Sequence, residues 1–201
     1  MRVITGTARG RRLETLAGED TRPTAERVKE ALFSAIQFDI EGRRVLDLFA
    51  GSGQLGIEAL SRGAAGCVFV DKNPEAALVI RRNLKAAGFS AGTQVLSLEA
   101  ASYLAHAKDV FDLVFLDPPY AAGLLEPSLA LAAAHTAPGG VIVCESGAGQ
   151  PLPDRAGNLS LARTYRYGRV HIRIYRWDGG AQQQTTEGND THEGSDLSGQ
   201  L

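Results

Sequence analysis

The stretch "VLDLFAGSGQLGIEALSRG", residues 45–63, predicts a strand that passes through a glycine-rich turn into a helix. Gly51, Gly53 and Gly56 form the pattern G-x-G-x-x-G, and Asp71 ends the next apolar run 20 residues after Gly51. A turn of this kind between a strand and a helix, followed by an acid at this distance, is typical of α/β proteins that bind a nucleotide. A glycine turn that only closes the corner between strand and helix is the structural alternative.

Strands and helices alternate along the chain beyond this stretch. Five strands that alternate with helices imply parallel strands in a doubly wound α/β sheet. Residues 158–177 then predict two strands that turn near Gly168, which would form an antiparallel C-terminal hairpin. The predicted parallel strands are residues 43–49, 66–71, 93–98, 111–117 and 139–146, and the helices between them are residues 54–63, 74–88, 100–107 and 124–136.

The two ends of the chain differ from this alternating body. Residues 2–16 predict short strands around Gly6 and Gly10, and a helix follows with Pro23 in its first turn. Residues 179–201 are polar and rich in glycine, which predicts a disordered tail. We therefore expect an N-terminal β-hairpin extension over residues 1–20, a main domain over residues 21–178 and the tail.

The composition excludes some classes of protein. No run of eighteen apolar residues is present, so we expect no membrane span, and the N-terminus lacks the apolar core of a signal peptide, which predicts a cytoplasmic protein. Cys67 and Cys144 lie in strand-like runs and are expected to be buried thiols. No cluster of Cys and His has the spacing of zinc ligands, so we expect no metal site.

Charge is segregated along the chain, which the net charge of −2 conceals. Residues 1–12 and 155–176 contain arginines and no acid, whereas the segment after Trp177 contains five acids and neither Lys nor Arg. Without those five acids the body has 21 basic and 18 acidic residues, a net charge of +3. Basic segments at both ends of the body favour an anionic polymer as partner. The alternative is that these arginines only lie on solvated strand faces.

Asp47 helps to distinguish two nucleotide ligands. It ends the first strand just before the glycines, where its carboxylate would repel a diphosphate. The same carboxylate suits an ammonium and a sulfonium, which S-adenosylmethionine carries, although a helix N-cap or a turn acid is the alternative. Asp71 can accept hydrogen bonds from both hydroxyls of a ribose. An NAD-dependent oxidoreductase would also explain the glycine turn and Asp71.

The stretch "FDLVFLDPPY", residues 111–120, ends a buried strand in an acid and two prolines. Asp117 and Pro118 each precede a proline and should be extended, and neither proline has an N–H group. The turn therefore offers two acceptors, the Asp117 carboxylate and the Pro118 carbonyl, beside the ring of Tyr120. This DPPY motif suits the amine of a nucleobase, with the base stacked on Tyr120 and unpaired or flipped out of its helix.

Four segments in this order resemble the bacterial 16S ribosomal RNA guanine-N2 methyltransferase family, over about residues 1–177. They are "RPTAERVKEALFSAI", "DLFAGSGQLGIEALSRGA", "VDKNPEA" and "LDPPY". The resemblance implies a Rossmann-like methyltransferase fold with its methyltransferase domain over residues 21–178. It also implies S-adenosylmethionine as methyl donor and a guanine of 16S RNA as acceptor. We expect this RNA to be part of an assembling or assembled small ribosomal subunit, and we expect the protein to be a monomer.

Chemistry and resemblance together assign the site residues. Glu99 stands where this family often has Asp, is one methylene longer and can still accept from the adenine amine, although a helix N-terminal acid is the alternative. Thr24 is either a contact or a helix cap. Catalysis is assigned to Asp117, Pro118 and Tyr120. Cofactor binding is assigned to Asp47, Phe49, Gly51, Ser52, Gly53, Asp71, Lys72, Glu99, Ala100 and Asp117. Binding of the RNA substrate is assigned to Pro119, Tyr120, Arg22, Thr24, Arg9, Arg11, Arg12, Arg166 and Arg169, with Arg173 as a further candidate.

Other functions stay open at this point. The DPPY motif permits an adenine-N6 methyltransferase that acts on DNA or RNA as well as a guanine-N2 enzyme. A protein glutamine methyltransferase would more usually have Asn in place of Asp117. An oxidoreductase leaves the DPPY motif unexplained, and an RNA-binding module without catalysis leaves the glycine turn unexplained.

Overall fold

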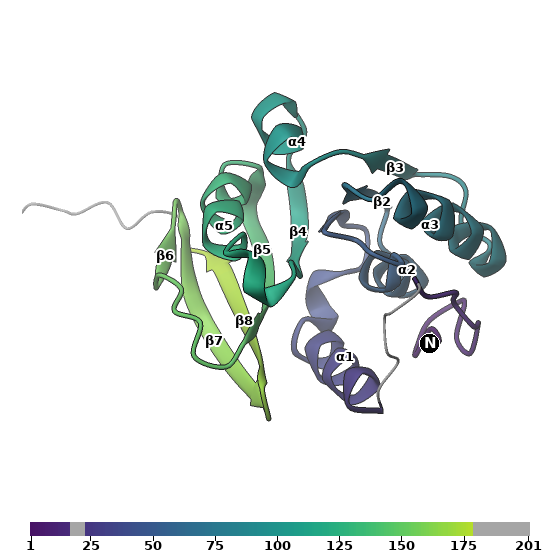
Figure 1. Cartoon of the computed structure of the whole chain (residues 1–201), viewed down its shortest axis with the longest axis horizontal. Helices are drawn as coiled ribbons and strands as arrows, with labels where there is room; N and C mark the ends of the chain where they lie inside the picture. Colours follow the sequence, from purple (N-terminus) through teal and green to yellow (C-terminus); the bar gives the residue numbers. More distant parts are fainter. Residues whose placement is uncertain (17–22, 179–201) are drawn as a thin grey trace, which may run out of the picture.

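The computed structural model describes residues 1–16 and 23–178, and for residues 23–25 and 121 it describes the backbone alone. The predicted tail over residues 179–201 lies outside the described residues. In the described part, one eight-stranded sheet has the order β3-β2-β1-β4-β5-β8-β7-β6 (Figure 1). The strands are β1 (Arg44–Leu48), β2 (Gly66–Asp71), β3 (Thr93–Ser97), β4 (Phe111–Leu116), β5 (Thr136–Gly147), β6 (Arg155–Ala156), β7 (Leu159–Tyr167) and β8 (Val170–Trp177).

The pairing of the strands confirms the predicted fold. β1 pairs in parallel with β2 and β4, β2 with β3, and β4 with β5, whereas β8 is antiparallel to both β5 and β7. The chain leaves β1 toward β2 and later returns to β4 on the other side, so the order reverses between β1 and β4. Ligands bind at the carboxyl ends of the strands beside such a reversal in open α/β sheets. β6 was not predicted.

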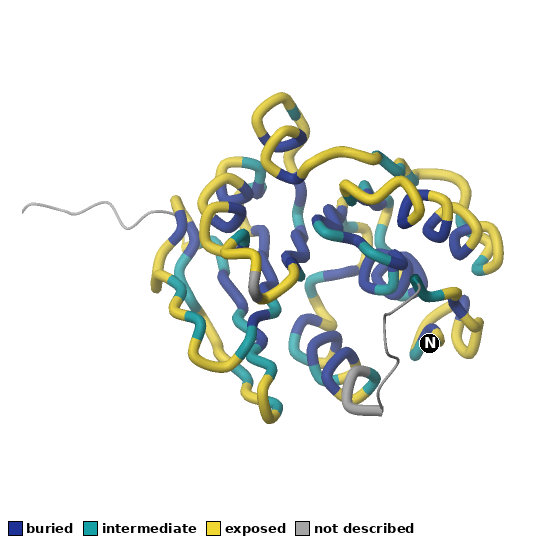
Figure 2. Tube along the Cα trace, in the orientation of Figure 1, coloured by how far each residue is buried: buried dark blue, intermediate teal, exposed yellow. Residues whose placement is uncertain are grey.

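Helices cover both faces of the sheet (Figures 1 and 2). The core on one face packs α1 (Pro23–Ala35), α2 (Gln54–Ser61) and α3 (Pro74–Ala87) against the strands, and the core on the other face packs α4 (Ala100–His106) and α5 (Leu125–Ala133). Proline begins α1 and α3 and glycine follows α3, because proline fits a first helical turn and glycine adopts the left-handed conformation at a helix end.

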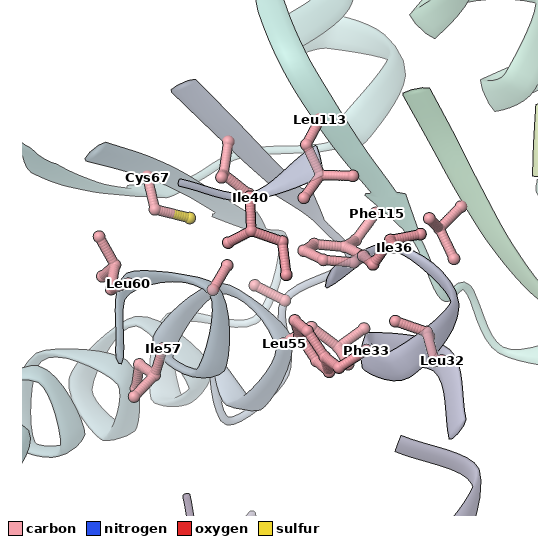
Figure 3. Close-up of a cluster of buried hydrophobic side chains, with 14 of the residues drawn as sticks. Leu32, Phe33, Ile36, Ile40, Leu55, Ile57, Leu60, Cys67, Leu113 and Phe115 are labelled. Atoms are coloured by element: carbon pink, nitrogen blue, oxygen red, sulfur yellow. The ribbon is translucent and has the colours of Figure 1, made fainter. Parts of the chain in front are cut away.

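Aromatic and branched side chains fill the first of these cores. Phe33 of α1 and Phe115 of β4 lie with ring centroids 5.6 Å apart at an angle of 54°, among Ile36 and Leu55 (Figure 3). Cys67 lies in the same core, and Cys144 lies in the core on the other face. Both cysteines are free and buried, which confirms the prediction of packing thiols.

The predicted N-terminal hairpin is short, with one antiparallel bridge between Arg2 and Arg12. The N–H groups of Val3 and Leu13 donate across it to the carbonyl oxygens of Arg11 and Met1, both at 2.9 Å. Helix α2 also holds the segment. At Gly6, which has a φ of +87°, an added Cβ would lie 1.7 Å from the carbonyl oxygen of Ser61, so only glycine fits there. Val3, Ala8 and Leu13 are buried in the core that α1, α2 and α3 share. The division of the chain at residue 20 remains a prediction.

Candidate active site

A cavity of about 400 Å³ lies at the carboxyl ends of β1, β2 and β4, beside the reversal of strand order. The first turns after β3 and β4 and the end of the N-terminal segment complete its wall. None of the described helices is long and apolar enough to cross a membrane. Ten of the predicted site residues line the cavity: Phe49, Gly51, Asp71, Lys72, Glu99, Ala100, Asp117, Pro118, Pro119 and Tyr120.

Asp71 orients the glycine turn toward the cavity. Its Oδ2 accepts a hydrogen bond from the N–H of Gly51 at 2.8 Å, and its Oδ1 accepts one from the N–H of Asn73 at 2.8 Å. Each carboxylate oxygen keeps capacity for a further donor. Phe49, just before the turn, has a φ of +70°, which is uncommon for a residue with a side chain and is typical of functional turns.

Asp47, which was predicted to bind the cofactor, is not among the residues that line the cavity. Its side chain is 1% exposed, and its Oδ2 accepts a hydrogen bond from the N–H of Gly56 at 2.9 Å in the first turn of α2. Burial raises the pKa of Asp47 to about 7, against the opposing effect of the Gly56 N–H. Asp47 is thus a buried acid at the junction of β1 and α2, and its role as a cofactor ligand stays a prediction.

Ser52 and Gly53 also lie behind the cavity wall rather than in it. Ser52 is buried, and a Cβ added to Gly53 would lie 3.1 Å from Cγ1 of Ile80. Gly53 has a φ of +77° and precedes α2 directly. These two residues shape the turn in which Gly51 reaches the cavity.

Asn83 on α3 supports the site, although no motif of the sequence points to it. Its side chain is 1% exposed, accepts from the N–H of Glu14 at 2.8 Å, and donates to the carbonyl oxygens of Glu14 at 3.0 Å and Ser52 at 2.9 Å. It therefore ties the N-terminal segment to the glycine turn and brings Leu16 to the cavity wall. The signal in the sequence that could have identified Asn83 is a polar residue on the buried face of a predicted helix.

The DPPY turn follows β4 and forms the other side of the cavity. Pro119 is extended, with φ −54° and ψ 125°, and Tyr120 begins the short 3₁₀ helix Tyr120–Ala122. Tyr120 is 45% exposed, and its hydroxyl donates to Oε1 of Glu145 at 2.6 Å. Burial and this hydrogen bond raise the pKa of Tyr120, so its hydroxyl stays protonated. The ring thus offers a partly exposed aromatic face beside Asp117.

Glu99 and Lys72 lie at the end of the cavity formed by β2 and β3. Glu99 directly precedes α4, but its side chain makes no capping hydrogen bond there. Its Oε1 lies 3.7 Å from Nζ of Lys72, and both side chains are largely exposed. Glu99 therefore lies at a helix N-terminus, as the alternative interpretation of this residue expected. Glu99 also lines the cavity, as its prediction as a cofactor ligand requires.

Of the predicted RNA contacts, Pro119 and Tyr120 line the cavity, whereas the described arginines do not. The N-terminal segment and the β7–β8 hairpin flank α1 on its two sides (Figure 1). Arg22 lies outside the described residues, as does the side chain of Thr24. Arg173 is half-buried and donates to Ser146 Oγ at 2.6 Å and to the carbonyl of Gln150 at 2.8 Å, so it already braces the end of β5. The other predicted arginines in the described residues are exposed: Arg9, Arg11 and Arg12 before α1, and Arg166 and Arg169 in the hairpin.

Comparison with known proteins places this site in a family. Residues 1–176 match the family described as "Conserved hypothetical protein 95". The chain is 41% identical to "Putative rRNA methyltransferase YlbH" of Bacillus subtilis, over 88% of this chain and 98% of that protein. It is 37% identical to "Ribosomal RNA small subunit methyltransferase D" of Escherichia coli strain K12, over 88% of this chain and 89% of that protein.

A solved structure agrees with these sequence matches. "Putative methyltransferase yhhF from Escherichia coli" superimposes with a TM-score of 0.77 at 35% identity, over 88% of this chain and 97% of that one. The fold, the order of the motifs and the extent of the matches lead to one conclusion. The chain belongs to the conserved hypothetical protein 95 family, which is the family of the bacterial small subunit ribosomal RNA methyltransferase D.

Proposed function

We propose that this protein transfers a methyl group from S-adenosylmethionine to the exocyclic N2 amine of a guanine in 16S ribosomal RNA of the small ribosomal subunit. One observation carries the proposal: the glycine turn with Asp71 and the DPPY turn with Asp117 line the same cavity. One part of the cavity can therefore bind a nucleoside, and the part next to it can bind an amine. The names of the related proteins, rRNA methyltransferases, support the reaction and the class of substrate.

The residues of the cavity fit S-adenosylmethionine. Its volume of about 400 Å³ suits a ligand of this class. Asp71 can accept from the ribose hydroxyls with its remaining lone pairs, and Glu99 can accept from the adenine amine while the N–H of Ala100 donates to the ring. Gly51 lets the backbone approach the ligand closely. When bound, the cofactor supplies a methyl carbon activated by its sulfonium sulfur.

The DPPY turn prepares the amine of the acceptor base. The lone pair of N2 is delocalised into the guanine ring, which makes N2 a poor nucleophile. The Asp117 carboxylate and the Pro118 carbonyl can accept its two hydrogens and direct its lone pair at the methyl carbon. Positioning of this kind contributes on the order of 7–11 kcal/mol to lowering a barrier. Asp117 then takes the proton that N2 loses as it gains the methyl group.

The exposed surfaces around the cavity suit RNA. Tyr120 can stack on a base that has left its helix, which is worth roughly 1–3 kcal/mol. Arg9, Arg11 and Arg12 on one side and Arg166 and Arg169 on the other can contact phosphates. Binding of RNA should therefore weaken as salt concentration rises, since each phosphate contact releases counterions.

Replacement of Asp71 by alanine is expected to weaken binding of S-adenosylmethionine by roughly 10–100-fold, the effect of losing a hydrogen bond to a charged group. The reason is twofold, because the ribose loses an acceptor and the Gly51 N–H loses the partner that orients the turn. Isothermal titration of the purified variant measures the Kd. Asp109→Ala, which removes an exposed carboxylate outside the cavity lining, is the control and should leave the Kd unchanged. Unaltered cofactor affinity together with weaker RNA binding would show that the ribose assignment is wrong.

Two measurements test the proposed function as a whole. Titration of the wild-type protein should show binding of S-adenosylmethionine and none of NAD, which excludes the oxidoreductase. Mass spectrometry of 16S RNA from a strain that lacks the gene should show the loss of one N2-methylguanosine. Loss of an N6-methyladenosine instead would establish the adenine enzyme, and an unchanged set of modified nucleosides would refute methylation of this RNA.

A further inference from the structure

Glu145 lies beside the DPPY turn, although neither the motifs nor the mechanism so far gives it a role. β4 and β5 are parallel neighbours, and their register pairs Leu116 with Cys144. The next residues along the two strands are Asp117 and Glu145. The carboxyl ends of the two strands therefore bring a second acid next to the one that is proposed to hold the acceptor amine.

The carboxylate of Glu145 is held in place by Tyr120. The Tyr120 hydroxyl donates to Oε1 of Glu145 at 2.6 Å. The ring also lies over the end of β5, since a Cβ added to Gly147 would be 3.5 Å from Cδ2 of Tyr120. The stacking ring lines the cavity, and the carboxylate of Glu145 lies directly beside that ring, next to the lining residues rather than among them.

Glu145 has capacity for another donor. It is half-buried, and within residues 1–16 and 26–178 the ion pairs of the structure do not include it. Burial raises its pKa, since the charged form loses hydration. A carboxylate has about four lone-pair positions, and the Tyr120 hydroxyl uses one of them. A donor on the ligand would recover part of the lost hydration.

The base that presents such a donor is guanine. Its N2 amine and its N1–H form a row of donors, whereas adenine presents the N6 amine next to an N1 lone pair. A carboxylate accepts from N1–H of guanine and repels the N1 lone pair of adenine. A site built to hydrogen-bond one group discriminates strongly against an analogue that lacks it.

We propose that Glu145 determines the choice of base: its carboxylate, oriented by the Tyr120 hydroxyl, accepts the N1–H of the guanine whose N2 amine lies against Asp117 and Pro118. This inference rests on the proposed function, since it concerns the same acceptor site. The DPPY motif permits guanine and adenine alike, and Glu145 would decide between them.

The test uses 2-aminopurine, which has the amine of guanine at C2 but no hydrogen on N1. Small subunits are assembled with 16S RNA that carries guanine or 2-aminopurine at the methylated nucleotide, and kcat/KM is measured for both. The wild-type protein should favour guanine by about 10–100-fold, the discrimination expected of a good base contact. Glu145→Gln should reduce this ratio to about threefold or less, because an amide can accept from N1–H or donate to a bare N1.

Two further variants separate this role from a structural one. Tyr120→Phe keeps the stacking ring and removes the hydroxyl that orients Glu145, so the ratio should fall between those of wild type and Glu145→Gln. Glu126→Gln, which changes an exposed acid on α5, is the control and should keep the wild-type ratio. The Kd for S-adenosylmethionine should be the same in all of these proteins, which shows that the cofactor half is intact.

Equal use of guanine and 2-aminopurine by the wild-type protein would overturn the role of Glu145, as would a wild-type ratio in Glu145→Gln. Both results leave formation of N2-methylguanosine, and hence the proposed function, in place. Failure of the wild-type protein to methylate guanine would instead refute the proposed function and this inference together.

Discussion

Replacement of Asp117 by alanine is expected to lower kcat for methyl transfer by roughly 10²–10⁴-fold, the range seen when a positioned acid–base or charge-stabilising group is removed. Asp117 follows β4 directly and lines the cavity together with Pro118. Without its carboxylate, one hydrogen of the acceptor amine loses its acceptor, the lone pair is no longer directed, and the released proton loses its base. Affinity for S-adenosylmethionine should change by no more than about threefold, since Asp71 and the glycine turn are untouched.

Asp117→Asn is the matched variant for this prediction. The asparagine keeps one carbonyl acceptor of nearly the same shape but cannot take a proton, so its kcat should lie between those of wild type and Asp117→Ala. Single-turnover rates with small subunits from the deletion strain, together with titration of the cofactor, provide both quantities. Full turnover by the alanine variant would show that this carboxylate has no part in the reaction.

Replacement of Glu58 by alanine is expected to reduce the free energy of unfolding by about 3–5 kcal/mol, as found when one partner of a buried ion pair is removed. Glu58 on α2 is 0% exposed and accepts from the backbone N–H groups of Ile4 at 2.7 Å and Thr5 at 3.0 Å. It also accepts from Nε of Arg62 at 2.9 Å and lies 3.8 Å from Nζ of Lys29. Its loss would leave the N–H groups of Ile4 and Thr5 without this acceptor and the buried ammonium of Lys29 without its carboxylate partner.

Urea denaturation followed by circular dichroism measures this change. For a chain of this size, about 3–5 kcal/mol corresponds to a fall in Tm of roughly 10 °C. Glu30→Ala changes an exposed acid on α1 and should alter stability by less than about 0.5 kcal/mol. A loss below about 1 kcal/mol in Glu58→Ala would mean that the N-terminal segment, which Glu58 fastens to α2, contributes little to the fold.

The arrangement of strands and helices was predictable because the periods of strand and helix differ and because proline and glycine mark the ends of helices. Asp71, Glu99 and Asp117 could be placed at one site because they follow strands or begin helices at the same edge of a parallel sheet. The strand order, which puts β4 next to β5, decides the environment of Glu145. Periodicity does not reveal that order, so Glu145 was seen only as part of a predicted strand.

Three other features depend on contacts between distant segments. The burial of Asp47 depends on how α2 packs on β1. The sequence alone does not distinguish an acid at a strand end that points into such a junction from one that points into a cavity. Asn83 joins Glu14 to Ser52, which are far from it in the chain. The N-terminal hairpin is tied to α2 because Glu58 and Ser61 accept N–H groups of its turn.

The most direct test of the central claim is methyl transfer by the purified protein. Small subunits from the deletion strain are incubated with the protein and S-adenosylmethionine carrying an isotopically labelled methyl group, and the 16S RNA is digested to nucleosides. We predict that the label appears in N2-methylguanosine, in about one residue per subunit, and that Asp117→Ala gives almost none. Label in N6-methyladenosine, or no transfer by a protein that binds the cofactor, would contradict the assignment.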